Sequence, residues 1–247
     1  AGSSFLSAII VIEELAKVDP SVSVMCDVHN TLVNTVLRKY ANEHLQKKYM
    51  PSLSTDKLGS FCLSEPNSGS DAFAMKTSVK KSDDGSHYII NGSKMWITNS
   101  GEAEFFIVFA QGDPSKGYKG ISAFAVEKEM GVEIGKKESK LGIRASSTCT
   151  VNFDNVKVPA ENLIGEEGRG YKIAIEILNE GRVGIGAQMV GLAQGAFDRA
   201  LAYTHDREQF AKPIAKFQGL QFQMAQVATE IEACLLYTSD AADEEDS

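Results

Sequence analysis

Serine hydroxyls gather around one glycine in the stretch FCLSEPNSGSD, residues 61–71. An apolar run ends at Leu63, and Ser64, Ser68 and Ser70 follow close to Gly69. Hydroxyl groups can donate hydrogen bonds, and a glycine lets backbone amides approach a ligand closely. This composition suits an anion or a polar ring system, although most such stretches only turn the chain.

The single tryptophan lies in KMWIT, residues 94–98. A lone tryptophan on a strand usually belongs to the core. Here Thr98 follows Trp96 by two residues, so on a regular strand the two side chains share a face. An aromatic wall beside a hydroxyl would fit a flat heterocycle, and both interpretations stay open at this point.

Other motifs do not support a different chemistry. The four histidines are scattered without an HxxxH or HExxH pair, so no metal ligands are expected. No GxSxG elbow indicates a serine hydrolase. GEEGRGYK, residues 165–172, lacks the spacing of a phosphate-binding loop and is better explained as a helix start.

Composition narrows the class of protein. The chain has 247 residues, 43% of them hydrophobic, which allows one to three domains. Five of its 33 acidic residues lie among the last eight, so the remainder is nearly balanced and no basic block for nucleic acid is present. No apolar run is long enough for a membrane span, and no signal peptide is visible. The four well-separated cysteines predict buried thiols in a reducing compartment.

Three segments of different periodicity must position these residues. Residues 5–50 predict helices, with Asp19 or Ser21 as a cap for the second and a stop at Pro51. Residues 60–160 predict short strands of an antiparallel barrel or sandwich, with turns at Asp84-Gly85 and a hairpin at Asn91-Gly92.

Helical periodicity returns at 170–208 and again at 216–236, with a pause at Lys212-Pro213. The long helix contains five glycines, each costing about 1 kcal/mol against alanine in a helix interior. We expect close approach of another helix, or of a ligand, to offset that cost. The glycines are Gly181, Gly184, Gly186, Gly191 and Gly195.

Six stretches occur in an order that resembles the acyl-CoA dehydrogenase family of flavoproteins. They are FCLSEPNSGSD, NGSKMWIT, GYKG, KLGIRASSTC, NEGR and REQFAKPIAKFQGLQ. The resemblance extends to about Cys234 and implies an N-terminal helical domain, a central antiparallel β-barrel and a C-terminal helical bundle. The expected domains are 1–58, 59–163 and 164–236, followed by an acidic tail, 237–247, that looks non-native.

The resemblance also implies site residues. FAD is the expected cofactor, bound by Phe61, Cys62, Leu63, Ser64, Gly69, Ser70, Trp96, Ile97, Thr98, Arg207 and Gln218. Acyl-CoA is expected at Ser70, Tyr118, Tyr171, Asn179, Glu180, Gly181 and Arg182. Arg207 and Gln218 would reach a neighbouring subunit's FAD, which implies a homo-oligomer, usually a tetramer. Similar proteins usually carry Gly-Ala where this chain has Asn67-Ser68, and Asn67 is expected to tolerate a positive φ.

The implied reaction is oxidation of the Cα–Cβ bond of a short- or branched-chain acyl-CoA, in fatty-acid or branched-chain amino-acid catabolism. A carboxylate removes the α-proton, hydride goes to the flavin, and an electron-transferring flavoprotein takes the electrons. We expect a fragment shortened at both ends that lacks the usual base, and no catalytic residue is assigned; Glu180, Glu65 and Asp71 are weak substitutes. Alternatives are an acyl-CoA oxidase and a non-catalytic acyl-CoA- or flavin-binding fragment. The compartment would be the mitochondrial matrix if the source is eukaryotic.

Overall fold

The computed structural model describes the backbone of residues 4–245 and the side chains of residues 4–237. The chain divides into two compact units. The sheet unit comprises residues 28–181, and the helix unit comprises residues 1–27 and 182–247. The expected domain boundaries stay predictions; residues 28–58 and 164–181 group with the sheet. No helix of the described part is long and apolar enough to cross a membrane.

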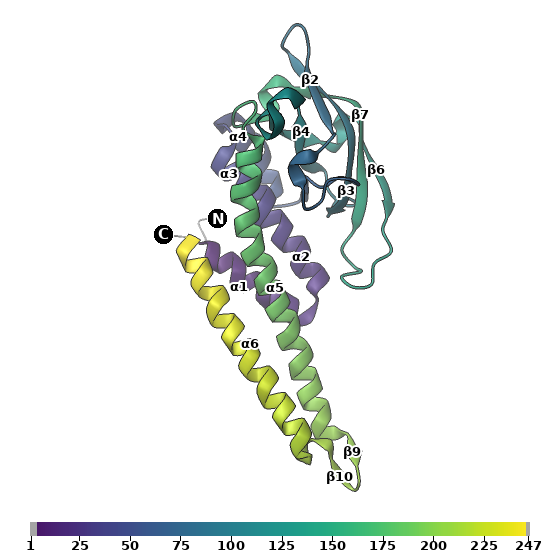
Figure 1. Ribbon diagram of the computed structural model, residues 1–247, viewed down its shortest axis with the longest axis vertical. Helices are drawn as coiled ribbons and strands as arrows, with labels where there is room; N and C mark the ends of the chain where they lie inside the picture. The colour runs from purple at the N-terminus through teal and green to yellow at the C-terminus, as the bar shows by residue number, and fades with distance from the viewer. Residues whose placement is uncertain (1–3, 246–247) are drawn as a thin grey trace. The chain divides into compact units, whose positions relative to one another are not determined.

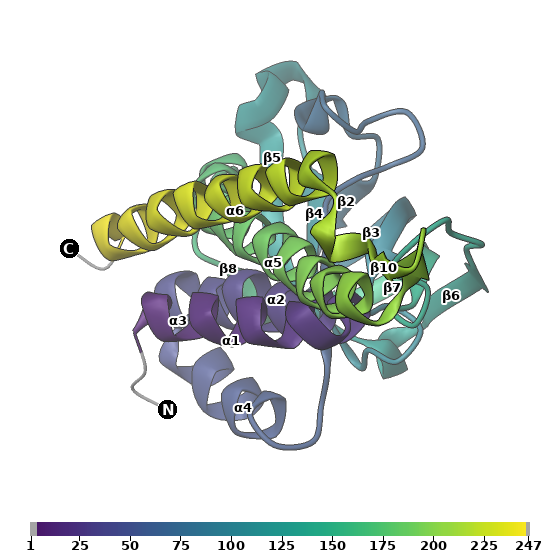
Figure 2. The ribbon, with the colours of Figure 1, turned by 90° about the horizontal axis from the view of Figure 1, so that it is seen from below.

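The helix unit begins with α1 (Phe5–Val18), which Ser4 caps by accepting the N–H of Ser7. Asp19 then caps α2 (Pro20–Asp27), because its carboxylate accepts the N–H of Ser21 over 2.7 Å, as expected. Figure 2 shows α2 folded back beside α1. The apolar stripe of α1 packs on Ala187 of the long helix α5 (Gly170–Asp206).

The glycines of α5 confirm close helix packing at four of the five positions. A Cβ added at Gly191 would lie 2.2 Å from the carbonyl oxygen of Glu13, and one at Gly195 would lie 2.1 Å from that of Lys17. Gly184 faces Asp27 and Gly181 faces Leu32 at similarly short range, whereas Gly186 faces open space. Close contact therefore offsets the cost in helix propensity at four sites, through backbone atoms at Gly191 and Gly195 and through side chains at the other two, but not at Gly186.

A short hairpin, β9 (Glu208–Gln209) and β10 (Lys212–Pro213), follows α5 where the sequence predicted a pause. The chain then reverses, and α6 (Gln218–Glu245) runs back alongside (Figure 1). Helix α6 continues beyond the expected end at residue 236 into the acidic tail. The side chains of residues 238–247 lie outside the described part.

The sheet unit starts with helices that continue from α2. They are η1 (Val28–Asn34), a π-helix, then α3 (Thr35–Tyr40) and α4 (Glu43–Leu53). Pro51 lies inside α4, so the predicted stop at this residue was wrong. Pro51 lacks the N–H that would bond to the carbonyl of Lys47, and the helix ends shortly after it, at Leu53.

Eight strands form one mixed sheet in the order β6-β7-β3-β2-β4-β5-β8, with β1 pairing on β4. Their bounds are β1 (Gly59–Cys62), β2 (Ser78–Lys81), β3 (His87–Thr98), β4 (Phe105–Gln111), β5 (Ile121–Glu127), β6 (Val132–Lys137), β7 (Thr148–Pro159) and β8 (Leu163–Ile164). The predicted central β domain is thus confirmed, but β1 and β2 pair with β4 in parallel rather than antiparallel. Four short 3₁₀ turns (Ala72–Ala74, Pro114–Gly120, Lys128–Met130 and Ala160–Asn162) connect these elements.

The hairpin predicted at Asn91-Gly92 was wrong. Strand β3 passes straight through these residues, and the turn at Asp84-Gly85 makes the hairpin between β2 and β3. The pairing of β3 with β7 instead shifts register between Ile90 and Gly92. Gly92 has φ 147°, and a Cβ there would lie 2.6 Å from the Cα of Thr77, so the glycine serves a bulge and a close backbone approach.

Buried thiols were predicted for all four cysteines, and the structure confirms this for two. Cys62 and Cys149 are buried, Cys26 is half-buried, and Cys234 on α6 is exposed. All four are free thiols.

Candidate functional site

The two segments that the sequence singled out lie side by side in the sheet unit. The N–H of Met95 donates to the carbonyl oxygen of Ser64 over 2.9 Å. The hydroxyl of Ser60 donates to the carbonyl oxygen of Thr98, also over 2.9 Å. The edge of β1 therefore runs along the end of β3, and the serine-rich bend begins next to Trp96.

Trp96 is 57% exposed and does not belong to the core. Between Lys94 and Ile97, strand β3 carries two residues where its partner β7 carries only Thr150. This bulge turns Trp96 outward at φ 63°, in the left-handed region that non-glycine residues rarely adopt. Backbone held in this region costs energy that surrounding contacts must offset, and such residues cluster at functional sites.

The bend closes on itself through Ser68. Glu65 and Ser68 exchange two backbone hydrogen bonds, and the Ser68 hydroxyl donates to the carbonyl oxygen of Asp71 over 2.7 Å. Ser68 is thus buried and its hydroxyl is already bonded, whereas Ser64 is half-buried and Ser70 is exposed. Asn67 is not among the residues with positive φ, so the turn does not need the tolerance expected of it.

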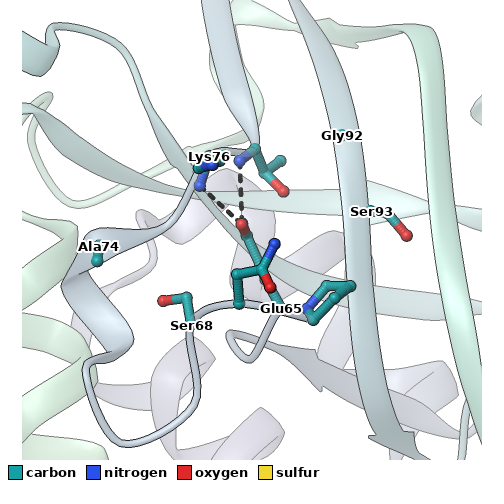
Figure 3. Close-up of a pocket in the computed structure, with 9 residues that line it drawn as sticks. Glu65, Ser68, Ala74, Lys76, Gly92 and Ser93 are labelled. Atoms are coloured by element: carbon teal, nitrogen blue, oxygen red, sulfur yellow. Dashed lines mark hydrogen bonds between the residues drawn. The ribbon is translucent and has the colours of Figure 1, made fainter.

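A buried ion pair lies beneath the bend. The Nζ of Lys94, which is 0% exposed, lies 2.9 Å from a carboxylate oxygen of Glu65. That carboxylate also accepts the N–H groups of Lys76 and Thr77, over 2.6 and 3.0 Å (Figure 3). Burial alone would raise the pKa of Glu65, but the charge of Lys94 and these hydrogen bonds hold the pKa below its usual value. Glu65 is therefore a fixed anion of the fold.

A shallow pocket of about 180 Å³ opens between the bend and β3. Its lining includes Glu65, Asn67, Ser68, Lys76 and Ser93 (Figure 3). Sites for drug-sized ligands are usually about 300–1,000 Å³, so this pocket is too small for a dinucleotide cofactor.

Several predicted site residues have side chains that are buried in the sheet unit, so only their backbone can line the edge formed by β1 and β3. Phe61 is buried against Phe109, with ring centroids 5.0 Å apart. Cys62 lies in the core of the sheet, where burial raises the pKa of its thiol to about 12. Leu63 and Ile97 are also buried, whereas Ser64 and Thr98 are half-buried and Gly69 and Ser70 are exposed.

Tyr118 and Tyr171 lie in ring contact, with centroids 4.8 Å apart. The structure brings these two together from the 3₁₀ turn before β5 and the start of α5. Phe73 joins them edge-on, 6.5 Å from Tyr171. Sequence reasoning missed Phe73, whose only signal was an aromatic ring directly after the serine-rich bend.

Glu180 on α5 is buried and forms an ion pair with Lys39 of α3. A neighbouring hydrogen bond joins Tyr40 to Glu176. Glu180 is thus engaged within the sheet unit, which weakens it as a substitute for a catalytic base. Asn179 is exposed one residue before it.

The remaining predicted residues belong to the helix unit. Arg182 is exposed on α5, and Arg207 and Gln218 flank the β9–β10 hairpin. The carbonyl of Arg207 accepts the N–H of Ile214 over 2.8 Å, which closes the hairpin, and Phe210 at its tip is 88% exposed. Their expected contacts with substrate and cofactor stay predictions. Among the residues that the structure describes, no cluster of His, Cys, Asp or Glu could hold a metal ion.

Three family models match almost the whole chain. They describe the N-terminal, middle and C-terminal domains of acyl-CoA dehydrogenases and match residues 1–57, 60–156 and 168–247, respectively. The chain belongs to the acyl-CoA dehydrogenase family.

Individual members of the acyl-CoA dehydrogenase family are similar over the same length. The mitochondrial short/branched chain specific acyl-CoA dehydrogenase of Rattus norvegicus is 56% identical over 241 residues, which is 97% of this chain and 55% of the rat protein. Butyryl-CoA dehydrogenase from Megasphaera elsdenii is 43% identical with a TM-score of 0.96, covering 99% of this chain and 64% of that chain.

An acyl-CoA dehydrogenase from Bacillus anthracis, solved in complex with FAD, is 37% identical with a TM-score of 0.91. The match covers 97% of this chain and 41% of that one. This chain therefore spans roughly half of the length of the curated relatives that it matches. The family and its three-part fold are established by these similarities.

Proposed function

We propose that this protein is a FAD-dependent dehydrogenase that converts short- or branched-chain acyl-CoA to enoyl-CoA. The observation that carries the proposal is the pairing of the serine-rich bend with the Trp96 bulge, in a chain that is 56% identical to a short/branched chain specific enzyme. When bound, FAD supplies the two-electron acceptor for oxidation of the Cα–Cβ bond.

The residues present fit such a ring system. Within residues 4–237, the hydroxyls of Ser64 and Thr98 have no hydrogen-bond partner, so both are free to bind a polar ring edge. An added Cβ at Gly69 would meet nothing within 4 Å, so the fold itself does not demand glycine there. The exposed indole of Trp96 offers an apolar face beside them.

We propose that Ser64 and Thr98 hold the ring, with Trp96 packed against it, and that the outward backbone at Gly69 and Ser70 receives the phosphate-bearing part. The Tyr118–Tyr171–Phe73 cluster would line the acyl-CoA path. Removal of a weakly acidic α-proton would require that the bound cofactor and substrate exclude water from this site. We assign no residue of this chain as the base.

The finer parts of the proposal concern partners. We propose that the electrons pass to an electron-transferring flavoprotein, that the protein is a homo-oligomer in which Arg207 and Gln218 reach a neighbouring subunit's FAD, and that a eukaryotic source would place it in the mitochondrial matrix. The family resemblance supports these assignments, and the name of the rat relative supports the last.

The test is anaerobic mixing of the purified chain, loaded with FAD, with acyl-CoA. We expect a yellow protein. Bleaching of its visible flavin band, faster with a short branched acyl-CoA than with a long straight-chain one, would show turnover and a base within this chain. Peroxide formation in air without another acceptor would instead indicate an oxidase. A yellow protein that no acyl-CoA bleaches would indicate binding without turnover, and a colourless one would contradict the proposal.

A further inference from the structure

The charged side chain of Lys94 lies in the protein interior, where loss of hydration costs free energy. It is completely buried, and lysine is almost never fully buried unless it is paired. Replacing a buried ion pair by apolar residues of similar volume often leaves stability unchanged or improves it. A contribution to stability therefore does not by itself explain why a buried Lys94–Glu65 ion pair is present here.

The contacts of Lys94 join its own strand to two other pieces of chain. Its Nζ donates to the carbonyl oxygen of Leu63 over 3.0 Å, to Glu65 over 2.9 Å, and lies 3.8 Å from the Sδ of Met75. Leu63 and Glu65 lie at the start of the bend, and Met75 follows its end. One ammonium group thus holds both ends of the bend.

Glu65 completes the same arrangement from the other side. Its carboxylate accepts the N–H groups of Lys76 and Thr77, which lead into β2, while its own backbone forms the bridge to Ser68. A neutral side chain could not accept all three of these donors equally well, because a carboxylate offers two acceptor oxygens and no donor. The pair therefore fixes where the bend starts and where it ends.

The same lysine borders the bulge that turns out the indole. Lys94 is the last residue in register with β7 before the shift, and Met95, which follows it, bonds to Ser64. Any displacement of Lys94 would move the bend and Trp96 together relative to the sheet. The pair links the two segments that the proposed flavin site requires.

We propose that Glu65 and Lys94 are a positioning pair that holds the serine-rich bend and the Trp96 bulge in register to receive a flavin ring. The inference rests on the proposed function, and neither side chain is expected to touch the ring. We therefore expect variants without the pair to bind the flavin ring more weakly, even when their stability equals that of the parent.

The experiment compares Lys94→Met with the double variant Glu65→Gln/Lys94→Met in the full chain. The single variant leaves Glu65 as an uncompensated buried charge and should lower the melting temperature. The double variant removes both charges and should recover part of the loss, because the amide that replaces the Glu65 carboxylate still accepts one of the two backbone N–H groups. We expect FAD affinity to stay at least about tenfold below that of the parent in both variants. The quenching of Trp96 emission by bound FAD, a specific signal because Trp96 is the only tryptophan, should weaken in both.

Lys48→Met is the matched control. Lys48 is exposed and pairs with the half-buried Glu127 over 2.8 Å in the same unit, without contact to the bend. This variant should bind FAD like the parent. If FAD affinity instead follows melting temperature, so that the double variant binds like the parent, the pair is merely structural and the proposal is wrong. The double variant decides the question if the single variant does not fold.

Amide hydrogen exchange in the flavin-free chain separates this inference from the proposed function. We expect the N–H of Met95, bonded to Ser64, to exchange at least about tenfold faster in both Lys94 variants and at the parental rate in Lys48→Met. If the Met95 N–H exchanges at the parental rate in the Lys94 variants, the positioning role is wrong, whether or not these variants bind FAD. A parent chain that binds no FAD, with Met95 exchange accelerated as expected, would refute the proposed function and leave the register role established.

Discussion

Lys94 and Ile97 are both buried, although residues three apart on a regular strand point to opposite faces of the sheet. The extra residue of the bulge reconciles them, and it is the reason that Trp96 is exposed rather than packed in the core. The indole is thus placed by a backbone irregularity and not by its own hydrophobicity.

Trp96→Ala should therefore affect the ligand more than the fold. Because the side chain is 57% exposed, we expect the free energy of unfolding to change by about 1 kcal/mol or less. FAD affinity should fall about tenfold for the alanine variant and less for Trp96→Phe, which keeps an aromatic face. Titration of FAD into each variant measures this, and parental affinity in Trp96→Ala would contradict the proposed stacking.

Gly69→Ala should separate ligand binding from folding in the bend. Gly69 does not have a positive φ, and its added methyl group would meet nothing, so the melting temperature should stay equal or rise slightly. FAD affinity should fall severalfold, because the methyl group would occupy space that we assign to the cofactor. Affinity equal to that of the parent would show that the cofactor does not approach Gly69.

Gly92→Ala is the contrasting case for the same assay. Its φ of 147° and the 2.6 Å approach to Thr77 should make this change destabilising by about 2 kcal/mol or more. Thermal denaturation of the two variants side by side checks the difference.

Two glycines of α5 should respond to alanine in opposite directions. Gly186→Ala adds a methyl group in open space and should raise the free energy of unfolding by up to about 1 kcal/mol through helix propensity. Gly191→Ala would drive the methyl group into the carbonyl of Glu13 and should lower it by about 1–3 kcal/mol. Chemical denaturation measures both, and stabilisation by Gly191→Ala would show that α1 does not approach α5 as described.

His29 should make the sheet unit sensitive to acid. One ring nitrogen lies 2.7 Å from the carbonyl oxygen of Leu53, and the other accepts the N–H of Gly59 over 3.1 Å, which requires the neutral ring. Burial lowers the pKa of His29 below its usual 6.5, against the opposing effect of the Leu53 carbonyl.

Because the unfolded chain binds this proton more readily, the contribution of His29 to stability is complete above pH 6.5 and is lost as the pH falls toward the folded-state pKa. The slope should not exceed about 1.4 kcal/mol per pH unit. Denaturation between pH 7 and pH 5 should show this slope in the parent and in His44→Gln, which alters an exposed histidine, but a smaller slope in His29→Gln. An equal slope in His29→Gln would assign the acid sensitivity to other groups.

Much of the architecture was predictable because it rests on local signals. Periodicity gave the helices of both ends, and Asp19 capped α2 as expected, because a side chain acts there on its own neighbours. The hairpin prediction at Asn91-Gly92 was wrong because an Asn-Gly pair can form either a hairpin turn or a bulge. Strand β3 pairs with β7 on both sides of these residues, and this pairing produces a bulge rather than a turn. The sequence likewise could not distinguish Ser68 from Ser64 and Ser70 as a hydroxyl donor for a ligand. In the structure the Ser68 hydroxyl donates to the carbonyl oxygen of Asp71 within the bend.

Residue types and local spacing were enough to predict the family, the order of helical and strand segments, and the two stretches on which a flavin site would depend. Three features could be seen only in the folded chain: the Met95 N–H bonds to the Ser64 carbonyl, a bulge exposes Trp96, and the Lys94–Glu65 pair holds the bend against the strand. These contacts join residues that are far apart along the chain, and chain folding rather than local propensity sets their distances.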